Sequence, residues 1–402
     1  MGNDVLVAHP YKHHAFELGA AIAEAGRNVQ FVTPFYSKGL TAWLSRLPMN
    51  AGRRASGYAH PGLPASNVRC PLAATLLRAA LGTTRPAAFR DAFDRMTARY
   101  VLESAGRFEW LVTLQDYMPR TVDAAVQVDV RIWSDQILNQ TDGAMARIAA
   151  HHRVLGLPIP DHDESKNDAI LQKAQVITVP STYYESSLLS GGIPPGDIYK
   201  IPYGAFFEPQ HAVPHTATRE RQEFRVVARA NTIRKGGHLL LSAIESWGER
   251  WVAALGGGTM LVRVLGELAP SLVGRLSALT IPRNVRITHG TIPHNLVGEL
   301  YGNADLFVMP SLSESLSLAC LEALSFGLPL VVTPYTGIED VGGVCGFVVE
   351  DSVDSLGEGI LEAIASRQQF PGMSIRGRAL VRDVYNWQRY RRLMKDMIEA
   401  RM

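Results

Sequence analysis

The chain has 402 residues, of which 47% are hydrophobic and 19% charged, and its formal net charge is +2. One hydrophobic core rarely supports more than about 250–300 residues, so we expect two domains of about 200 residues each. No apolar run approaches the roughly 18 residues of a membrane-spanning helix, and a first strand begins by Val5 without a signal-peptide core. We therefore expect a soluble globular protein with neither a membrane span nor secretion.

The three cysteines, Cys70, Cys320 and Cys345, lie far apart in the sequence and form no C-x-x-C pair. This spacing indicates reduced thiols in a cytoplasmic protein and gives no metal-binding pattern. We therefore expect neither disulfides nor a metal site.

The chain opens with a strand, a loop, a helix and a second strand. Residues 4–8 are apolar, an amphipathic helix follows and stops at Gly26, and residues 29–33 are apolar again. This order predicts a doubly wound sheet, in which ligands bind beyond the carboxyl ends of the strands. His13 and His14 lie in the first such loop. They either bind an anionic group of a ligand or are ordinary, partly exposed loop residues.

A basic segment follows the second strand. Residues 36–90 contain eight Lys or Arg residues and no Asp or Glu, with Trp43 and several leucines interleaved. This composition predicts contact with an anionic lipid surface or a lipid-linked phosphate. The alternative is a solvated basic face without a partner.

Two further strands are predicted at residues 109–114 and 126–133. Asp116 and Asp135 follow them at the expected carboxyl edge of the sheet. We regard both carboxylates as candidates for contact with a ligand.

The second half of the chain also begins with a strand, at residues 224–228, and a helix is predicted from His238. Arg229 and Lys235 lie on the loop between them, six residues apart, and Gly236 lets the backbone turn closely round a ligand. Two cations across such a turn converge on one diphosphate.

The stretch NADLFVMPSLSESLSLACLEALSFGLPLVVTPYTG, residues 303–337, carries the most chemistry. A strand ending at Pro310 is followed by a serine-rich loop, a helix over about 316–326 capped by Ser315 or Ser317, and a second strand. We expect the N–H groups of residues 315–318 to point out of the helix N-terminus, where an anion is favoured.

Two glutamates flank this helix start, Glu314 before it and Glu322 inside the helix. Carboxylates only accept hydrogen bonds, so beside a phosphate site they suit hydroxyl-rich groups such as a sugar and a ribose. In the alternative interpretation, Glu314 caps the helix and Glu322 is a solvated helix residue.

The two glutamates and their flanking strands resemble the E-x7-E motif of the retaining GT-B glycosyltransferases, specifically glycosyltransferase family 4. The resemblance covers roughly residues 164–400 and is weak before them. It implies two Rossmann-like α/β domains facing a central cleft. It also implies roles for individual residues: Glu314 faces the donor sugar, Arg229 and Lys235 bind the diphosphate, Ser315, Leu316, Ser317 and Leu318 hold it through their backbone, Glu322 binds the ribose, and Gly290 lies near the base.

Two features depart from that family. Its first loop is commonly glycine-rich, whereas this loop carries histidines, a lysine and a proline. A histidine that the family often places after a strand near the reacting sugar is replaced by Trp133, Ser134 and Asp135. The acceptor side of the site is therefore less well defined than the donor side.

The resemblance also divides the chain. A Pro- and His-containing stretch after Ala205 predicts a linker. The last helix resembles one that crosses back to the first domain in this family. The predicted parts are an acceptor domain over residues 1–205, a linker over 206–222, a donor domain over 223–384 and a returning helix over 385–402.

The resemblance implies transfer of a sugar from a nucleoside diphosphate sugar to an acceptor hydroxyl of a glycan or lipid-linked saccharide, with retention and without a metal or other cofactor. We expect no nucleic-acid partner and, if the basic segment meets lipid, a peripheral position on the membrane. Two alternatives stay open: another enzyme of this fold, such as a nucleotide-sugar epimerase or glycan phosphorylase, or a catalytically silent nucleotide-sugar-binding subunit. The base, the sugar, the acceptor and the oligomeric state do not follow from the sequence.

Overall fold

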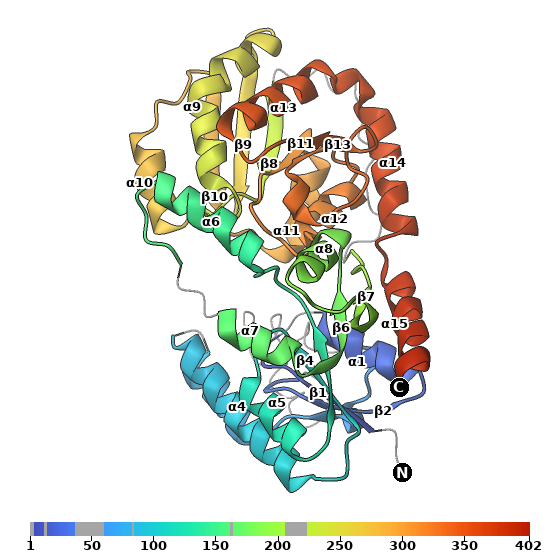
Figure 1. Ribbon diagram of the computed structural model, residues 1–402. Coiled ribbons are helices and arrows are strands. Elements are labelled where there is room, and N and C mark those ends of the chain that lie inside the picture. Colours follow the sequence, from blue (N-terminus) through green and yellow to red (C-terminus); the bar gives the residue numbers. More distant parts are fainter. Residues whose placement is uncertain (1–3, 12–13, 37–59, 83, 161–163, 206–222) are drawn as a thin grey trace.

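The computed structural model describes residues 4–11, 14–36, 60–82, 84–160, 164–205 and 223–402 (Figure 1). They form two parallel sheets that have helices packed on both faces, so the predicted α/β fold class is confirmed. No helix in these ranges is long and apolar enough to cross a membrane.

The first sheet has seven strands in the order β3-β2-β1-β4-β5-β6-β7. Its strands are β1 (Asp4–Ala8), β2 (Asn28–Val32), β3 (Val68–Arg69), β4 (Trp110–Leu114), β5 (Arg131–Asp135), β6 (Ala174–Val179) and β7 (Ile198–Lys200). The helices of this half are α1 (Ala15–Glu24), α3 (Leu72–Leu81), α4 (Pro86–Glu103), α5 (Pro119–Gln127), α6 (Asp142–Val154), α7 (Glu164–Leu171) and α8 (Thr182–Ser190).

The second sheet has six strands in the order β10-β9-β8-β11-β12-β13. Its strands are β8 (Glu223–Ala228), β9 (Thr259–Leu265), β10 (Val285–Gly290), β11 (Leu306–Met309), β12 (Leu330–Val332) and β13 (Gly346–Val348). The helices of this half are α9 (Gly237–Ala254), α10 (Pro270–Ala278), α11 (His294–Gly302), α12 (Leu318–Ser325), α13 (Val353–Ala365), α14 (Phe370–Asp383) and α15 (Trp387–Arg401).

The central strands are apolar along their whole length because helices cover both faces of each sheet. In β11 all four residues are buried, and in β4 all five are. The strand order reverses between β1 and β4 in the first sheet and between β8 and β11 in the second. Such switch points leave a crevice at the carboxyl edge of a sheet, where ligands bind.

One predicted strand was wrong in part. Residues 126 and 127 end helix α5, and strand β5 begins only at Arg131. Pro119 starts that helix, and Thr121, Val122, Ala124 and Ala125 form its buried face. Proline suits the first turn of a helix, because the N–H group it lacks would have no partner there.

The last helix packs against the first half of the chain. Arg391 of α15 forms ion pairs with Glu17 and Glu24 of α1, at 2.8 and 3.2 Å. Below them, Tyr390, Met394, Met397 and Ile398 are buried. The predicted linker, residues 206–222, lies outside the described residues, and the domain boundaries stay predictions.

Helix α6 belongs to the first half of the chain but packs against the second half, which the sequence did not predict. Figure 1 shows it beside α9 and α10, and Ile148 is buried in the apolar core of the second half. His151 lies between two residues of that half, 2.9 Å from a ring nitrogen of His238 and 3.3 Å from Asp351. Burial, followed by the nearby His151, lowers the pKa of His238 to about 3, which keeps this imidazole neutral.

The Tyr390 side chain tests the packing of α15. Its hydroxyl is buried and has no hydrogen-bond partner among the described residues. We predict that Tyr390→Phe leaves the free energy of unfolding unchanged or raises it by about 1 kcal/mol, because an unpaired buried hydroxyl is lost. Tyr390→Ala should lower it by about 3–5 kcal/mol through the cavity left behind. Urea denaturation measures both, and a clear destabilisation by phenylalanine would contradict this packing.

Candidate functional site

The site lies at the switch point of the second sheet, where the loops after β8 and β11 meet. Glu314 follows β11, and its Oε1 accepts hydrogen bonds from Lys235 Nζ at 2.8 Å, Arg234 Nη1 at 2.7 Å and Ser311 Oγ at 3.2 Å. Burial alone would raise the pKa of Glu314, but the charges of Lys235 and Arg234 outweigh it and hold that pKa below its ordinary value. Burial also lowers the pKa of Lys235, and the nearby carboxylate partly offsets this. The predicted pair, Glu314 and Lys235, is thus in direct contact.

The close approach of the two loops requires Gly236. This glycine has a φ of +71°, and a Cβ atom there would lie 1.9 Å from the carbonyl oxygen of Pro310. Only glycine avoids that overlap and adopts this conformation without strain. The turn at Gly236 ends the β8–α9 loop against Pro310, at the start of the loop that carries Glu314.

The loop around Glu314 is attached to the first half of the chain by its serines. Ser313 Oγ donates to the carbonyl of Asn139 at 2.9 Å, and Ser315 Oγ donates to that of Ile137 at 2.6 Å. Both hydroxyls are buried and satisfied. The serines of this loop therefore serve to connect the two halves of the chain by hydrogen bonds.

The helix after this loop begins later than predicted. Helix α12 starts at Leu318, and the hydroxyl of Ser317 caps it by accepting from the N–H of Cys320. Ser315 and Leu316 belong to the preceding loop. The N–H of Ser317 donates to the carbonyl of Thr336 at 2.9 Å, so the prediction that this group points toward a phosphate was wrong.

Arg229 and Glu322 form the second part of the site. Arg229 Nη1 donates to the carbonyl of Leu265 at 2.7 Å, which holds the guanidinium at the carboxyl edge of the sheet. Burial raises the pKa of Glu322 to about 7, although the charge of Arg229 lowers it. A carboxyl group of this kind is half-protonated near neutral pH and is not the solvated helix residue of the alternative interpretation.

Gly290 and Gly266 close the edge beside Arg229. They pair through two backbone hydrogen bonds of 3.0 and 3.2 Å, with φ values of +133° and +92°. A Cβ atom at Gly266 would lie 2.6 Å from Arg229 Nη1. Both glycines were predicted at the ends of their strands, but only Gly290 was predicted as a site residue.

Arg234 was also missed, although it adjoins Lys235 and lies on Glu314. Its guanidinium donates to Glu314 and to the carbonyl of Ser313. The sequence shows two adjacent cations, but the spacing of the resembled family assigns diphosphate binding only to the second, Lys235. The three-dimensional site therefore contains three cations, at positions 229, 234 and 235.

The structure brings together two of the four acceptor candidates in the first half of the chain. His14 and Asp135 form a buried pair, with Nε2 and Oδ2 2.6 Å apart, and Thr178 donates to the other carboxylate oxygen. Both residues are almost fully buried, at 6% and 1% exposure, so they bind each other and do not line an open surface. Asp116 is half-buried beside Tyr117, while His13 lies outside the described residues.

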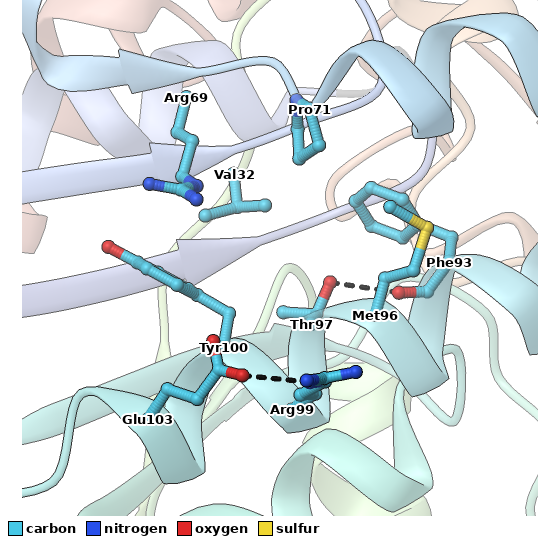
Figure 2. Close-up of a pocket in the computed structure, with 9 residues that line it drawn as sticks. All are labelled: Val32, Arg69, Pro71, Phe93, Met96, Thr97, Arg99, Tyr100 and Glu103. Atoms are coloured by element: carbon cyan, nitrogen blue, oxygen red, sulfur yellow. Dashed lines mark hydrogen bonds and ion pairs between the residues drawn. The ribbon is translucent and has the colours of Figure 1, made fainter.

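A small hollow of about 190 Å³ lies between β2, β3 and α4 (Figure 2). Its walls include Phe93, Met96 and Tyr100, and the guanidinium of Arg69 lies 4.4 Å from the centre of the Tyr100 ring. The hollow is smaller than the roughly 300–1,000 Å³ of typical ligand pockets. We assign no ligand to it.

The donor half of the chain matches a known family. Residues 213–378 match the family described as Glycosyl transferases group 1. Sulfoquinovosyl transferase SQD2 from Arabidopsis thaliana is 43% identical over 77 residues, which are 17% of this chain and 15% of that protein. A sucrose synthase from Denitrovibrio acetiphilus is 33% identical over 131 residues, 30% of this chain and 17% of its own length. The chain thus spans less than a fifth of either relative.

Solved structures match the whole chain. Sucrose-phosphate synthase from Thermosynechococcus elongatus aligns with a TM-score of 0.63 at 17% identity, covering 99% of this chain and 98% of its own. Anabaena HepE in complex with UDP-glucose gives 0.63 at 14% identity, and WaaG, a glycosyltransferase involved in lipopolysaccharide biosynthesis, gives 0.60 at 15%. These two cover 99% and 97% of this chain, and 99% of their own chains. These similarities show that the whole chain has the GT-B fold.

The Glu322 carboxyl gives a prediction for pH dependence. Its pKa of about 7 lies above that of the unfolded chain, so the native state binds this proton more tightly, and stability falls as pH rises toward and through 7. The side chain of Glu322→Gln does not titrate. Between pH 5 and pH 8 the free energy of unfolding of this variant should therefore rise by about 1–3 kcal/mol relative to that of wild type. Chemical denaturation of the nucleotide-free protein measures this difference.

An exposed carboxylate of α11 provides the matched control, Glu299→Gln. This variant reports the effect of the amide replacement away from the site. If Glu322→Gln differs from wild type by the same amount at both pH values, the carboxyl does not titrate as described.

Proposed function

We propose that this chain is a retaining glycosyltransferase of family 4, which moves a sugar from a nucleoside diphosphate sugar to an acceptor hydroxyl and forms an α-linkage. The observation that carries the proposal is the contact between Glu314 and Lys235, beside Arg229 and Glu322, at the switch point of the second sheet. The spacing of the two glutamates and the two cations is that of the family. The anion-binding groups and the acceptor-only carboxylates suit a phosphate and hydroxyl-rich groups respectively.

In the proposed reaction the bond between the sugar C1 and the diphosphate oxygen breaks, and the acceptor oxygen bonds to C1 on the same face. The proton of the acceptor hydroxyl passes to the departing phosphate oxygen. Arg229 and Lys235 stabilise the negative charge that develops on the diphosphate, as preorganised cations do in a water-poor site. Glu314 faces the sugar, and Glu322 accepts from the ribose.

No metal is part of this proposal. The described residues contain no group of three or more His, Cys, Asp or Glu side chains arranged to hold a metal ion. The charge stabilisation that a metal would supply is assigned to Arg229 and Lys235. The metal-free reaction stays a prediction, which an activity assay with chelator tests.

Other activities of the same fold would use the same anion site. A nucleotide-sugar epimerase or a glycan phosphorylase would also bind a phosphate between Arg229 and Lys235. Product analysis with and without an acceptor separates these enzymes from a transferase. Measured turnover by the isolated chain excludes a silent binding subunit.

For the acceptor, we propose a glycan or lipid-linked saccharide at an anionic membrane surface. Leu72 and Leu76 of α3 are 74% and 61% exposed, one turn apart, and Arg85 is exposed after the same helix. Exposed leucines beside cations are typical of a helix that lies in a membrane interface. The other half of the basic segment, including Trp43, lies outside the described residues.

The diphosphate assignment predicts the effect of removing its cations. Lys235→Ala and Arg229→Ala should each slow transfer about 100-fold to 1,000-fold, the loss of one preorganised charge stabiliser. Lys235 also neutralises buried Glu314, so some loss of stability accompanies Lys235→Ala, and Arg234 still pairs with the carboxylate. Initial rates with UDP-, GDP- and ADP-sugars measure the effect.

Arg286→Ala, at an exposed cation of β10, is the control and should turn over normally. The UDP-sugars come first in the screen because a structural neighbour, HepE, binds UDP-glucose. Near-normal turnover by the double variant of Arg229 and Lys235 would remove the diphosphate assignment.

The membrane assignment predicts sedimentation with vesicles that contain anionic lipid, with release by added salt. Each cation near such a surface contributes about 1 kcal/mol, and screening at physiological salt acts over about 8 Å. Changing Arg46, Arg53 and Arg54 together to Gln should weaken sedimentation, and Leu72→Ser with Leu76→Ser should do so without altering charge. If neither set changes vesicle binding or activity on a lipid-linked acceptor, the segment is a solvated face.

A further inference from the structure

A second pocket, of about 370 Å³, lies between α6, α7 and α8 in the first half of the chain. Its volume falls in the range of roughly 300–1,000 Å³ that is typical of small-molecule sites. None of the predicted donor or acceptor residues lines it. The wall side chains that matter here are Gln140, Asn167, Asp168, Gln172, Tyr183 and Ser187.

The lining favours a neutral ligand rich in hydroxyl groups. Amides, carboxylates and hydroxyls surround one aromatic ring, Tyr183, and such planar polar groups donate to and accept from sugar hydroxyls. Among the lining residues Asp142 and Asp168 are acidic, and Arg147 is the one cation. Arg147 is already engaged, because its Nη1 donates to Tyr183 at 3.1 Å and to the carbonyl of Leu312 at 3.4 Å. An anion would therefore meet two carboxylates and no available cation.

Asn167 is a buried amide in the wall of this pocket. The residue is 6% exposed, and its Nδ2 makes one long hydrogen bond of 3.4 Å to Gln136 Oε1. Its carbonyl oxygen is buried and has no hydrogen-bond partner among the described residues. Native proteins rarely leave a buried acceptor unpaired.

The pocket is connected to the proposed transfer site by two hydrogen bonds. Ser187 of its wall accepts from Asn139 Nδ2 at 3.2 Å, and the carbonyl of Asn139 accepts from Ser313 Oγ at 2.9 Å. Ser313 directly precedes Glu314. The wall of the pocket and the loop that carries Glu314 are therefore linked through Asn139.

We propose that the pocket between α6, α7 and α8 binds a neutral sugar unit of the acceptor glycan, away from the hydroxyl that reacts. The inference rests on the proposed glycosyltransferase function and adds to it the chemical class of the acceptor chain. Its role is to hold the acceptor, so it should govern the KM for the acceptor rather than kcat.

The test uses a double variant, Asp168→Ala with Gln172→Ala, because both side chains are exposed on the pocket wall and their removal spares the core. The matched control is Glu185→Ala with Ser186→Ala on α8, which removes one carboxylate and one polar group outside the lining. The probes are four neutral tetrasaccharides, maltotetraose, cellotetraose, mannotetraose and chitotetraose, in saturation-transfer NMR without donor. At least one should bind wild type and the control, and the pocket variant should bind it roughly tenfold more weakly.

With that tetrasaccharide as acceptor, the pocket variant should raise its KM roughly tenfold and leave kcat unchanged. Failure of every tetrasaccharide to bind, equal binding by the pocket variant, or binding of spermine in place of the sugars would each overturn the proposal. Titration with UDP and measurement of UDP-sugar turnover separate this result from the proposed function. Normal turnover with an unaffected pocket variant removes the pocket assignment alone, whereas sugar binding without turnover removes the transferase.

Discussion

The buried carboxylate of Glu314 is the constraint on which the rest of the site depends. Its side chain is only 11% exposed, and a carboxylate withdrawn from water to this degree is costly unless cations and hydrogen-bond donors surround it. Arg234 and Lys235 supply the charge, and Ser311 supplies a neutral donor. Because the cations and the carboxylate come from different loops, their contact fixes the β8–α9 loop against the β11–α12 loop. A nucleoside diphosphate would therefore meet cations that are already in place, which is the condition for electrostatic preorganisation.

The same loop couples the two halves of the chain. Ser313 and Ser315 donate to carbonyls of residues 137–139, while α15 packs on α1 and α6 packs on the second half. Each half thus contributes one helix to the other, and the serines beside Glu314 add hydrogen bonds to these contacts. Separation of the halves would exchange the serine hydrogen bonds for hydrogen bonds to water, at a net cost of about 0.5–1.5 kcal/mol for each. The geometry around Glu314 is consequently tied to residues 137–139, which directly precede Gln140 of the proposed acceptor pocket.

Much of the fold could be predicted because buried parallel strands are continuous apolar runs, as in Leu306–Met309. The proximity of Glu314 and Lys235 could also be predicted, because each lies on the loop after one of the two strands that meet at the switch point. The start of α12 was not, because Ser315 and Ser317 are equally good caps and only the hydrogen bond from Ser315 to the other half decides between them. Adjacent Arg234 and Lys235 look alike in sequence, and only the turn at Gly236 places both on Glu314. The apolar pattern of α6 predicts a buried face but not which half of the chain covers it.

The central claim is that Arg229 and Lys235 bind the diphosphate while Glu322 accepts from the ribose. The most direct measurement is a crystal structure of the chain soaked with UDP, or with whichever nucleoside diphosphate binds most tightly. The account predicts phosphate oxygens within hydrogen-bond distance of the Arg229 guanidinium and the Lys235 ammonium, and ribose hydroxyls on the Glu322 carboxylate. A nucleotide bound elsewhere, or one whose ribose and phosphates are exchanged between these groups, would contradict it.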